Sequence, residues 1–87
     1  MMPDEKARLM ESLLCSPYWE IVRERLDEEI KYLNLDISLA IKKQKYDTAS
    51  HLNGKLEMAE FIKALPERIV RENRSIIERV KEALSGS

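Results

Sequence analysis

Two side chains in this sequence, Cys15 and His51, have the chemistry of a nucleophile and its base. Each is the only residue of its kind in the chain. A thiolate next to an imidazole is a known catalytic pair, but Cys15 follows Leu13 and Leu14, a setting in which cysteine usually behaves as a small hydrophobic residue. The sequence contains no glycine-rich loop, nucleophile elbow, phosphate-binding loop or zinc-protease motif. We therefore expect no catalytic site and interpret the chain as non-enzymatic.

The same histidine is a poor candidate for a metal ligand. No cysteine pair is present to complete a zinc site with His51. Glu57 lies six positions further along the chain, a spacing that does not place two side chains on one face of a helix. We expect His51 to lie on the surface or at an interface, and we expect neither a metal nor a cofactor.

Three lysines, Lys42, Lys43 and Lys45, form a basic cluster that could contact phosphate groups. Lysines in this position also complement the negative end of a preceding helix dipole, which requires no ligand. The whole chain carries 15 basic and 16 acidic residues, for a formal net charge of −1. Because dedicated nucleic-acid binders usually present a basic field, nucleic-acid contact through these lysines is the weaker interpretation.

The composition predicts an all-α protein of one domain, residues 1–87, because helix-forming residues dominate and only two glycines and three prolines occur. Pro3 opens a short helix over 3–15, and Ser16 with Pro17 is a start signal for a long helix over 17–43. Apolar residues recur along this second helix at steps of three and four, with charges on its other faces. They are Trp19, Val22, Leu26, Ile30, Leu33, Ile37 and Ile41.

The polar stretch 42–47 predicts a turn, with Asp47 as the N-cap of the next helix. A second apolar stripe follows over 47–65, so we expect an antiparallel, coiled-coil-like helical hairpin. Pro66 kinks or ends this helix, because its ring clashes with the preceding turn. A helical pattern resumes over 67–84 and predicts a C-terminal helix, after which 85–87 form a frayed end.

A glycine inside a helix costs about 1 kcal/mol relative to alanine, so Gly54 suggests that another helix approaches closely at this point. A chain this short also has a marginal core of its own. We therefore expect protein partners, with a homo-oligomer formed through the apolar stripes. The predicted interface residues are Trp19, Val22, Leu26, Leu52, Gly54, Leu56, Ile69 and Ile76.

No apolar stretch approaches the ~20 residues that a membrane-spanning helix needs. The first residues, Met1 to Glu5, are polar and acidic, unlike a signal peptide. We expect no membrane association and a cytoplasmic location.

Two resemblances add to this interpretation. The segment from Ile37 to Ile41, followed by Tyr46-Asp47-Thr48-Ala49-Ser50-His51-Leu52 and then Leu56, resembles the UVR motif, a helical hairpin of nucleotide-excision-repair proteins and some protease adaptors. It has Leu52-Asn53-Gly54 where that motif usually has Leu-Arg-Asp. The resemblance implies a regulatory hairpin that binds a host or repair protein.

The second resemblance covers more of the chain. Trp19 and Leu26 in a charged helix, then Leu52-Asn53-Gly54-Lys55-Leu56, then Leu65-Pro66-Glu67, look like small helical proteins from the virion-morphogenesis regions of tailed bacteriophages. This resemblance implies a phage structural or assembly accessory that self-associates and docks on a larger protein assembly. Its location would then be the host cytoplasm or the virion.

Overall fold

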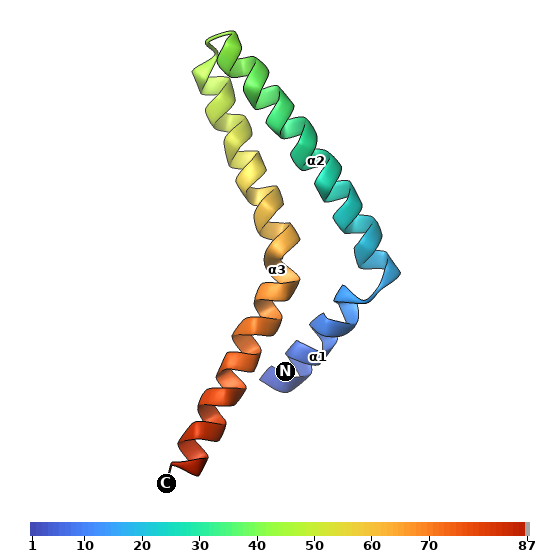
Figure 1. The fold of residues 1–87 in the computed structure, drawn as a ribbon, viewed down its shortest axis with the longest axis vertical. Helices are drawn as coiled ribbons and strands as arrows, with labels where there is room; N and C mark the ends of the chain where they lie inside the picture. The colour runs from blue at the N-terminus through green and yellow to red at the C-terminus, as the bar shows by residue number, and fades with distance from the viewer. Residues whose placement is uncertain (87) are drawn as a thin grey trace. The chain divides into compact units, whose positions relative to one another are not determined.

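The computed structural model describes residues 1–86, which form three α-helices and, within that range, no strand (Figure 1). Helix α1 spans Pro3–Leu14, α2 spans Pro17–Lys42 and α3 spans Tyr46–Ser85. This confirms the predicted all-α class. Residue 87, the last of the predicted frayed end, lies outside the described range.

The chain divides into two compact parts, which are described separately. The hairpin unit, Ile21–Lys63, contains most of α2, the turn and the first half of α3. The terminal unit combines Met1–Glu20 with Ala64–Ser87, so it contains α1 and the second half of α3.

The capping signal at the start of α2 is confirmed. Ser16 Oγ accepts a hydrogen bond from the Tyr18 backbone N–H at 3.1 Å. The Ser16 carbonyl accepts the first helical bond from Glu20 N–H at 3.2 Å. A serine N-cap followed by proline satisfies one donor and removes another, so few polar groups are left unpaired at this helix end.

The hairpin turn is tighter than the sequence suggests, with only Lys43, Gln44 and Lys45 between the two helices. The Lys45 N–H donates to the Ala40 carbonyl at 2.8 Å, and the Gln44 N–H donates to the Ile41 carbonyl at 3.0 Å. This pair of bonds is a Schellman motif, which places its C′ residue in the left-handed conformation. That residue is Gln44, with a φ of 59°.

The N-cap expected at Asp47 is wrong. Helix α3 begins at Tyr46, and the Lys45 carbonyl accepts the first helical bond from Ala49 N–H at 3.0 Å. Asp47 instead lies in the first turn, where its negative charge complements the helix dipole.

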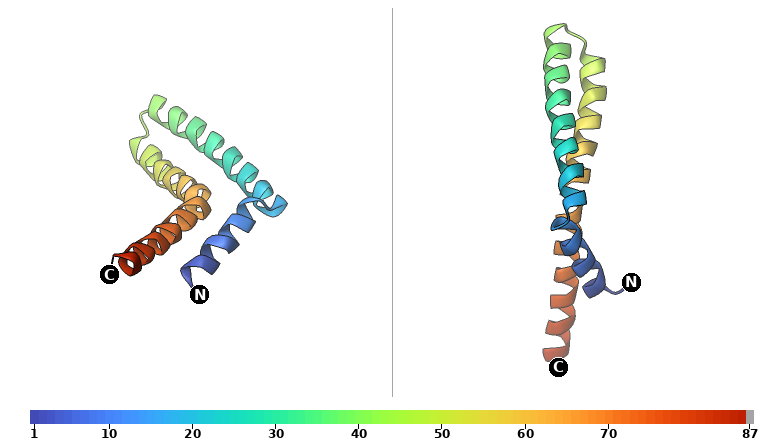
Figure 2. Two further views of the ribbon diagram at one scale, coloured as in Figure 1. Left: turned by 60° about the horizontal axis from the view of Figure 1, so that its bottom comes forward. Right: turned by 90° about the vertical axis from the view of Figure 1, so that its right-hand side faces the viewer.

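In the hairpin unit the two helices run antiparallel and side by side (Figures 1 and 2). Most of the buried side chains of this unit are small, and partly buried leucines such as Leu26, Leu52 and Leu56 accompany them. An ion pair joins Asp27 of α2 to Lys63 of α3. Small residues let two helix backbones approach closely, but they bury little apolar area. The buried apolar residues of this unit are Leu33, Ala40, Ala49 and Ala59.

The sequence predicts two helices here, over 47–65 and 67–84, and the helix ends predicted on either side of Pro66 are wrong. Helix α3 is continuous, with Pro66 inside it. An interior proline costs about 3 kcal/mol, through a lost hydrogen bond and a clash with the preceding turn. Pro66 is itself buried in the terminal unit, and burial of its ring offsets part of that cost.

Replacing Gln44 with glycine is expected to stabilise the fold by about 0.5–1 kcal/mol. A residue with a Cβ costs roughly 1–2 kcal/mol in the left-handed region, and glycine removes this cost. The larger backbone entropy that glycine loses on folding offsets part of the stabilisation. Urea unfolding at fixed protein concentration measures the change. Lys43→Gly is the control. Lys43 has no positive φ, so this substitution should destabilise the fold. Equal destabilisation by both substitutions would contradict the assigned turn.

Candidate protein-binding surfaces

The described residues contain no large side chain that is fully buried. Ala7 is 0% exposed and Leu33 is 6% exposed, and the other buried apolar residues are alanines. Several large apolar side chains are instead exposed, among them Tyr32 at 58% and Leu35 at 54%. Contiguous exposed apolar surface of this kind marks interaction sites.

The eight predicted interface residues do not form one surface within a unit. Trp19, Ile69 and Ile76 belong to the terminal unit, and the other five belong to the hairpin unit. Five of them are partly buried: Trp19, Leu26, Leu52, Leu56 and Ile69. The exposed ones are Val22, Gly54 and Ile76.

A second apolar stripe on α2 was missed by the sequence analysis, which assigned the other faces of this helix to charges. Tyr32, Leu35 and Leu39 are 58%, 54% and 52% exposed. Their steps of three and four place them on one face of the helix. Tyr32 and Leu39 each precede a buried residue of α2, Leu33 and Ala40, so they are turned about 100° away from α3. We call this stripe the outer face of α2.

Within the chain, the close helix approach expected at Gly54 is not present. A Cβ atom built at Gly54 would meet nothing within 4 Å, and the residue is exposed. The glycine therefore lies in open space in a single chain.

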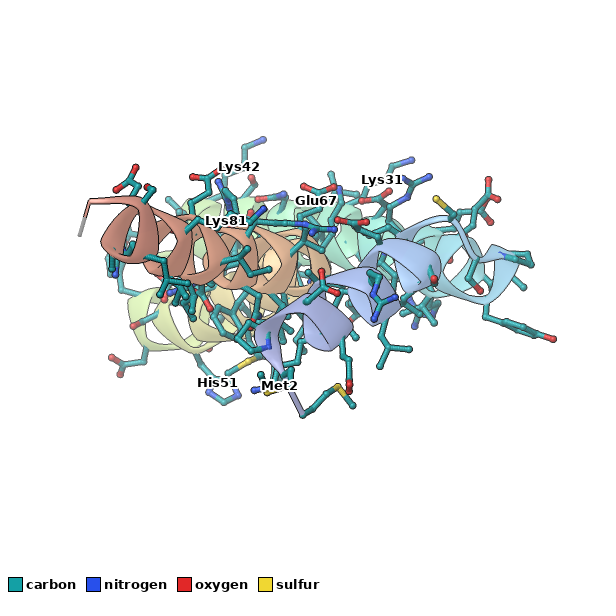
Figure 3. The ribbon with its side chains drawn as sticks, turned by 90° about the horizontal axis from the view of Figure 1, so that it is seen from below. Met2, Lys31, Lys42, His51, Glu67 and Lys81 are labelled. Carbon is teal, nitrogen blue, oxygen red and sulfur yellow. The ribbon has the colours of Figure 1, made fainter. Side chains whose placement is uncertain are left out.

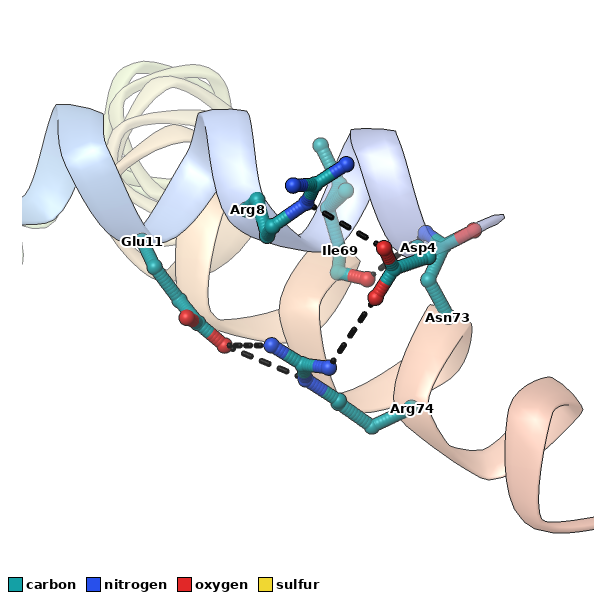
Figure 4. A network of polar contacts seen from close by, with 6 residues as sticks. All are labelled: Asp4, Arg8, Glu11, Ile69, Asn73 and Arg74. Carbon is teal, nitrogen blue, oxygen red and sulfur yellow. Dashed lines mark hydrogen bonds and ion pairs between the residues drawn. The ribbon is translucent and has the colours of Figure 1, made fainter. Parts of the chain in front are cut away.

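In the terminal unit, α1 is held against α3 by one arginine (Figure 4). Arg74 Nη2 and Nε both donate to Glu11 Oε1, at 2.7 and 3.2 Å, and Arg74 Nη1 lies 3.5 Å from Asp4 Oδ1. Arg8 pairs with the same aspartate at 3.2 Å. The hydrogen bond to Glu11, followed by the charges of Glu11 and Asp4, raises the pKa of Arg74 above its usual value. The arginine therefore keeps its charge wherever the carboxylates are ionised.

Asn73 is the one buried polar residue among those described, at 8% exposure. Its Nδ2 donates to the Ile69 carbonyl one turn earlier, at 2.8 Å (Figure 4). This bond satisfies the amide donor inside the helix that carries it. Next to it lies a shallow hollow of about 460 Å³, lined by Met1, Lys6, Leu9, Met10, Ile69, Glu72 and Asn73. Its shallow, mixed lining is unlike the enclosed apolar pockets that hold small ligands.

The apolar stripe of α3 continues towards the C-terminus beyond the part that contacts α1. Ile76 is 43% exposed and Val80 is 53% exposed. These residues lie four apart, so they share one face of the helix. The terminal unit thus carries an apolar face of its own.

The three tip lysines are all exposed, and Lys42 lies in the last turn of α2. There Lys42 complements the helix dipole, which is sufficient reason for a lysine at this position. In the hairpin unit, the labelled side chains of Lys42 and His51 point to opposite sides (Figure 3). His51 therefore does not extend the lysine cluster.

The structure also shows the surroundings of Cys15, which the sequence offered as a nucleophile. Cys15 is exposed at the C-cap of α1, and so the expectation that it packs as a small hydrophobic residue is wrong. The reason is that α1 ends at Leu14, which leaves Cys15 in the connection to α2. Within residues 1–86, no group of three or more His, Cys, Asp or Glu side chains is placed to hold a metal ion.

None of the helices in the described part of the chain is long and apolar enough to cross a membrane. No protein-family model, curated protein or solved structure compared with this chain matches it.

Gly54→Ala is expected to raise the free energy of unfolding by up to about 1 kcal/mol, since alanine has the higher helix propensity and its methyl group meets open space. Thermal unfolding followed by circular dichroism measures this, with Ser50→Ala, an exposed position one turn earlier, as the control. The solution mass should stay the same. A lower stability or a smaller assembly would instead place another chain against Gly54.

Proposed function

We propose that this chain is a non-enzymatic interaction protein that self-associates and docks on a larger protein assembly. The observation that carries the proposal is the mismatch between its apolar side chains and its core. Among the described residues, and apart from the Pro66 ring, four of the five buried apolar side chains are alanines, whereas Tyr32, Leu35, Leu39 and Val80 are each more than half exposed.

The energetics of burial support this proposal. Covering a large apolar side chain is worth about 1.5–3 kcal/mol relative to leaving it exposed. A stable interface of ordinary size covers about 800 Å² on each partner. Exposed apolar residues occur in both units, as Tyr32, Leu35 and Leu39 on α2 and as Ile76 and Val80 on α3. A self-interface through one of these faces leaves the other for a second protein partner.

The resemblance to small proteins of phage virion-morphogenesis regions gives this proposal a biological setting. In that setting the chain is an assembly accessory, present in the host cytoplasm or in the virion. Short helical chains that gain their core from neighbouring copies suit such a role, because their folding is coupled to the assembly.

A regulatory binder is the second candidate. It is favoured by the burial of Ala40 and Ala49, at 6% and 8% exposure, on either side of the turn. These are the two alanines of the UVR-like pattern. A binder of this kind would place the turn end of the hairpin against a host or repair protein, without any need to self-associate. Nucleic-acid binding through the tip lysines is a third and weaker candidate.

Size exclusion with light scattering is the experiment that separates these candidates. We expect a homo-oligomer both at physiological ionic strength and in about 0.5 M salt, where exposed charge pairs are largely screened. A monomer at both ionic strengths would contradict self-association and favour the regulatory binder.

The control for the third candidate replaces Lys42, Lys43 and Lys45 with glutamine. The oligomer should persist in this variant, and the unmodified protein should bind DNA and RNA negligibly near physiological salt. Binding that depends on these lysines and falls steeply with salt would instead support a nucleic-acid function.

A further inference from the structure

The outer face of α2 has a regular pattern that the proposed function does not by itself explain. Glu28 and Lys42 extend the stripe of Tyr32, Leu35 and Leu39 at its two ends. The five residues follow one another at steps of four, three, four and three. This is the heptad spacing with which one helix packs along another. At 1.5 Å per residue the stripe is about 21 Å long. An acidic residue stands at one end, a basic residue at the other, and apolar residues lie between.

Both end residues are exposed and have no ion-pair partner among the described residues. Neighbouring charges are paired, Arg25 with Glu29 at 3.0 Å and Asp27 with Lys63. Glu28 and Lys42 are therefore available to a partner on this face.

The order of charged and apolar residues along this stripe is complementary to the same order in a second copy that runs in the opposite direction. Leu35 lies midway between Glu28 and Lys42, seven residues from each. Two copies of the stripe that pack antiparallel about an axis at Leu35 bring each glutamate opposite a lysine. They also bring Tyr32 close to Leu39. Parallel packing would instead place glutamate against glutamate and lysine against lysine, which is unfavourable.

We propose that a second copy of this chain packs on the outer face of α2, antiparallel, about a two-fold axis that passes near Leu35. Such an interface is isologous, meaning that the same patch serves both copies. Tyr32, Leu35 and Leu39 form its apolar centre, and Glu28 of each copy pairs with the partner's Lys42. The inference rests on the proposed self-association and identifies the surface that carries it.

The apolar centre of the stripe is available to a partner, because Tyr32, Leu35 and Leu39 are each more than half exposed. The rim charges set the orientation more than the strength, because exposed ion pairs contribute little to affinity. The dimer therefore persists in high salt and in the triple lysine-to-glutamine variant.

Light scattering on Leu35→Lys tests the surface. Two lysines at the axis face each other, so the variant is expected to be monomeric at concentrations where the unmodified chain is a dimer. Tyr18→Lys is the matched control, an exposed aromatic residue of the same helix, 78% exposed and outside the stripe, and it should keep the dimer mass. An intact dimer in Leu35→Lys would overturn the inference while leaving self-association standing. A monomeric unmodified chain would overturn the proposed function itself.

Charge exchange tests the direction of packing. Glu28→Lys alone and Lys42→Glu alone should each weaken the dimer about tenfold. The double variant should restore it, because opposite charges again face each other. Parallel packing predicts no loss in either single variant, since like charges would face each other there as they do in the unmodified chain, and a failure of the double variant to restore the dimer would refute the antiparallel arrangement.

Disulfide trapping gives an independent measure of direction, in a Cys15→Ser background. Leu35→Cys is expected to cross-link two copies on oxidation. Glu28→Cys should not, since its two copies stand about 21 Å apart along the helices, too far for a disulfide. Glu28→Cys combined with Lys42→Cys should cross-link. Cross-linking by Glu28→Cys alone would show parallel packing and contradict the proposal.

Discussion

The structure depends on a limit set by helix geometry and chain length. A helix pair touches along one face of each helix, and in the hairpin unit the most buried residues of that face are Leu33 and three alanines. Alanine permits close approach and favours the helix, but it contributes little apolar area. Large apolar side chains also lie on the outer face of α2, where Tyr32, Leu35 and Leu39 are each more than half exposed. A pair of helices therefore leaves these three residues largely uncovered.

Local interactions then determine the course of the chain. The Ser16 cap starts α2, and the Schellman motif ends it with Gln44 in the left-handed conformation. In the terminal unit, Arg74 joins two carboxylates of α1 to α3. These contacts are mostly exposed, and exposed ion pairs stabilise weakly. They orient the helices, whereas the burial of apolar surface has to supply most of the stability.

Sequence periodicity was sufficient for the all-α class and for the start of α2, because these depend on local spacing and on one capping residue. The turn was located but its conformation was not, since Gln44 is not a residue whose type indicates a positive φ. Helix α3 continues through Pro66, whose ring is buried, and no local pattern reveals that burial. Arg74 and Glu11 are 63 residues apart, so their contact requires the fold.

The candidate surface shows a different limitation. The steps that join Tyr32, Leu35 and Leu39 are visible in the sequence, but the stronger stripe on the same helix accounts for its amphipathic pattern. Only the burial of Leu33 and Ala40 shows which stripe faces α3. Gly54 shows a related limit, because a glycine in a helix is compatible both with a close contact to another chain and with the open space that surrounds it within this one.

The central claim is that folding of this chain is coupled to its association. Thermal unfolding at several protein concentrations, followed by circular dichroism, tests it most directly. For a dimer of this length, an unfolding enthalpy of about 0.7 kcal/mol per residue gives a rise in Tm of about 4 °C for each tenfold increase in concentration. A Tm that stays constant over a roughly hundredfold range of concentration, with one cooperative transition, would show a self-sufficient monomer and contradict the account.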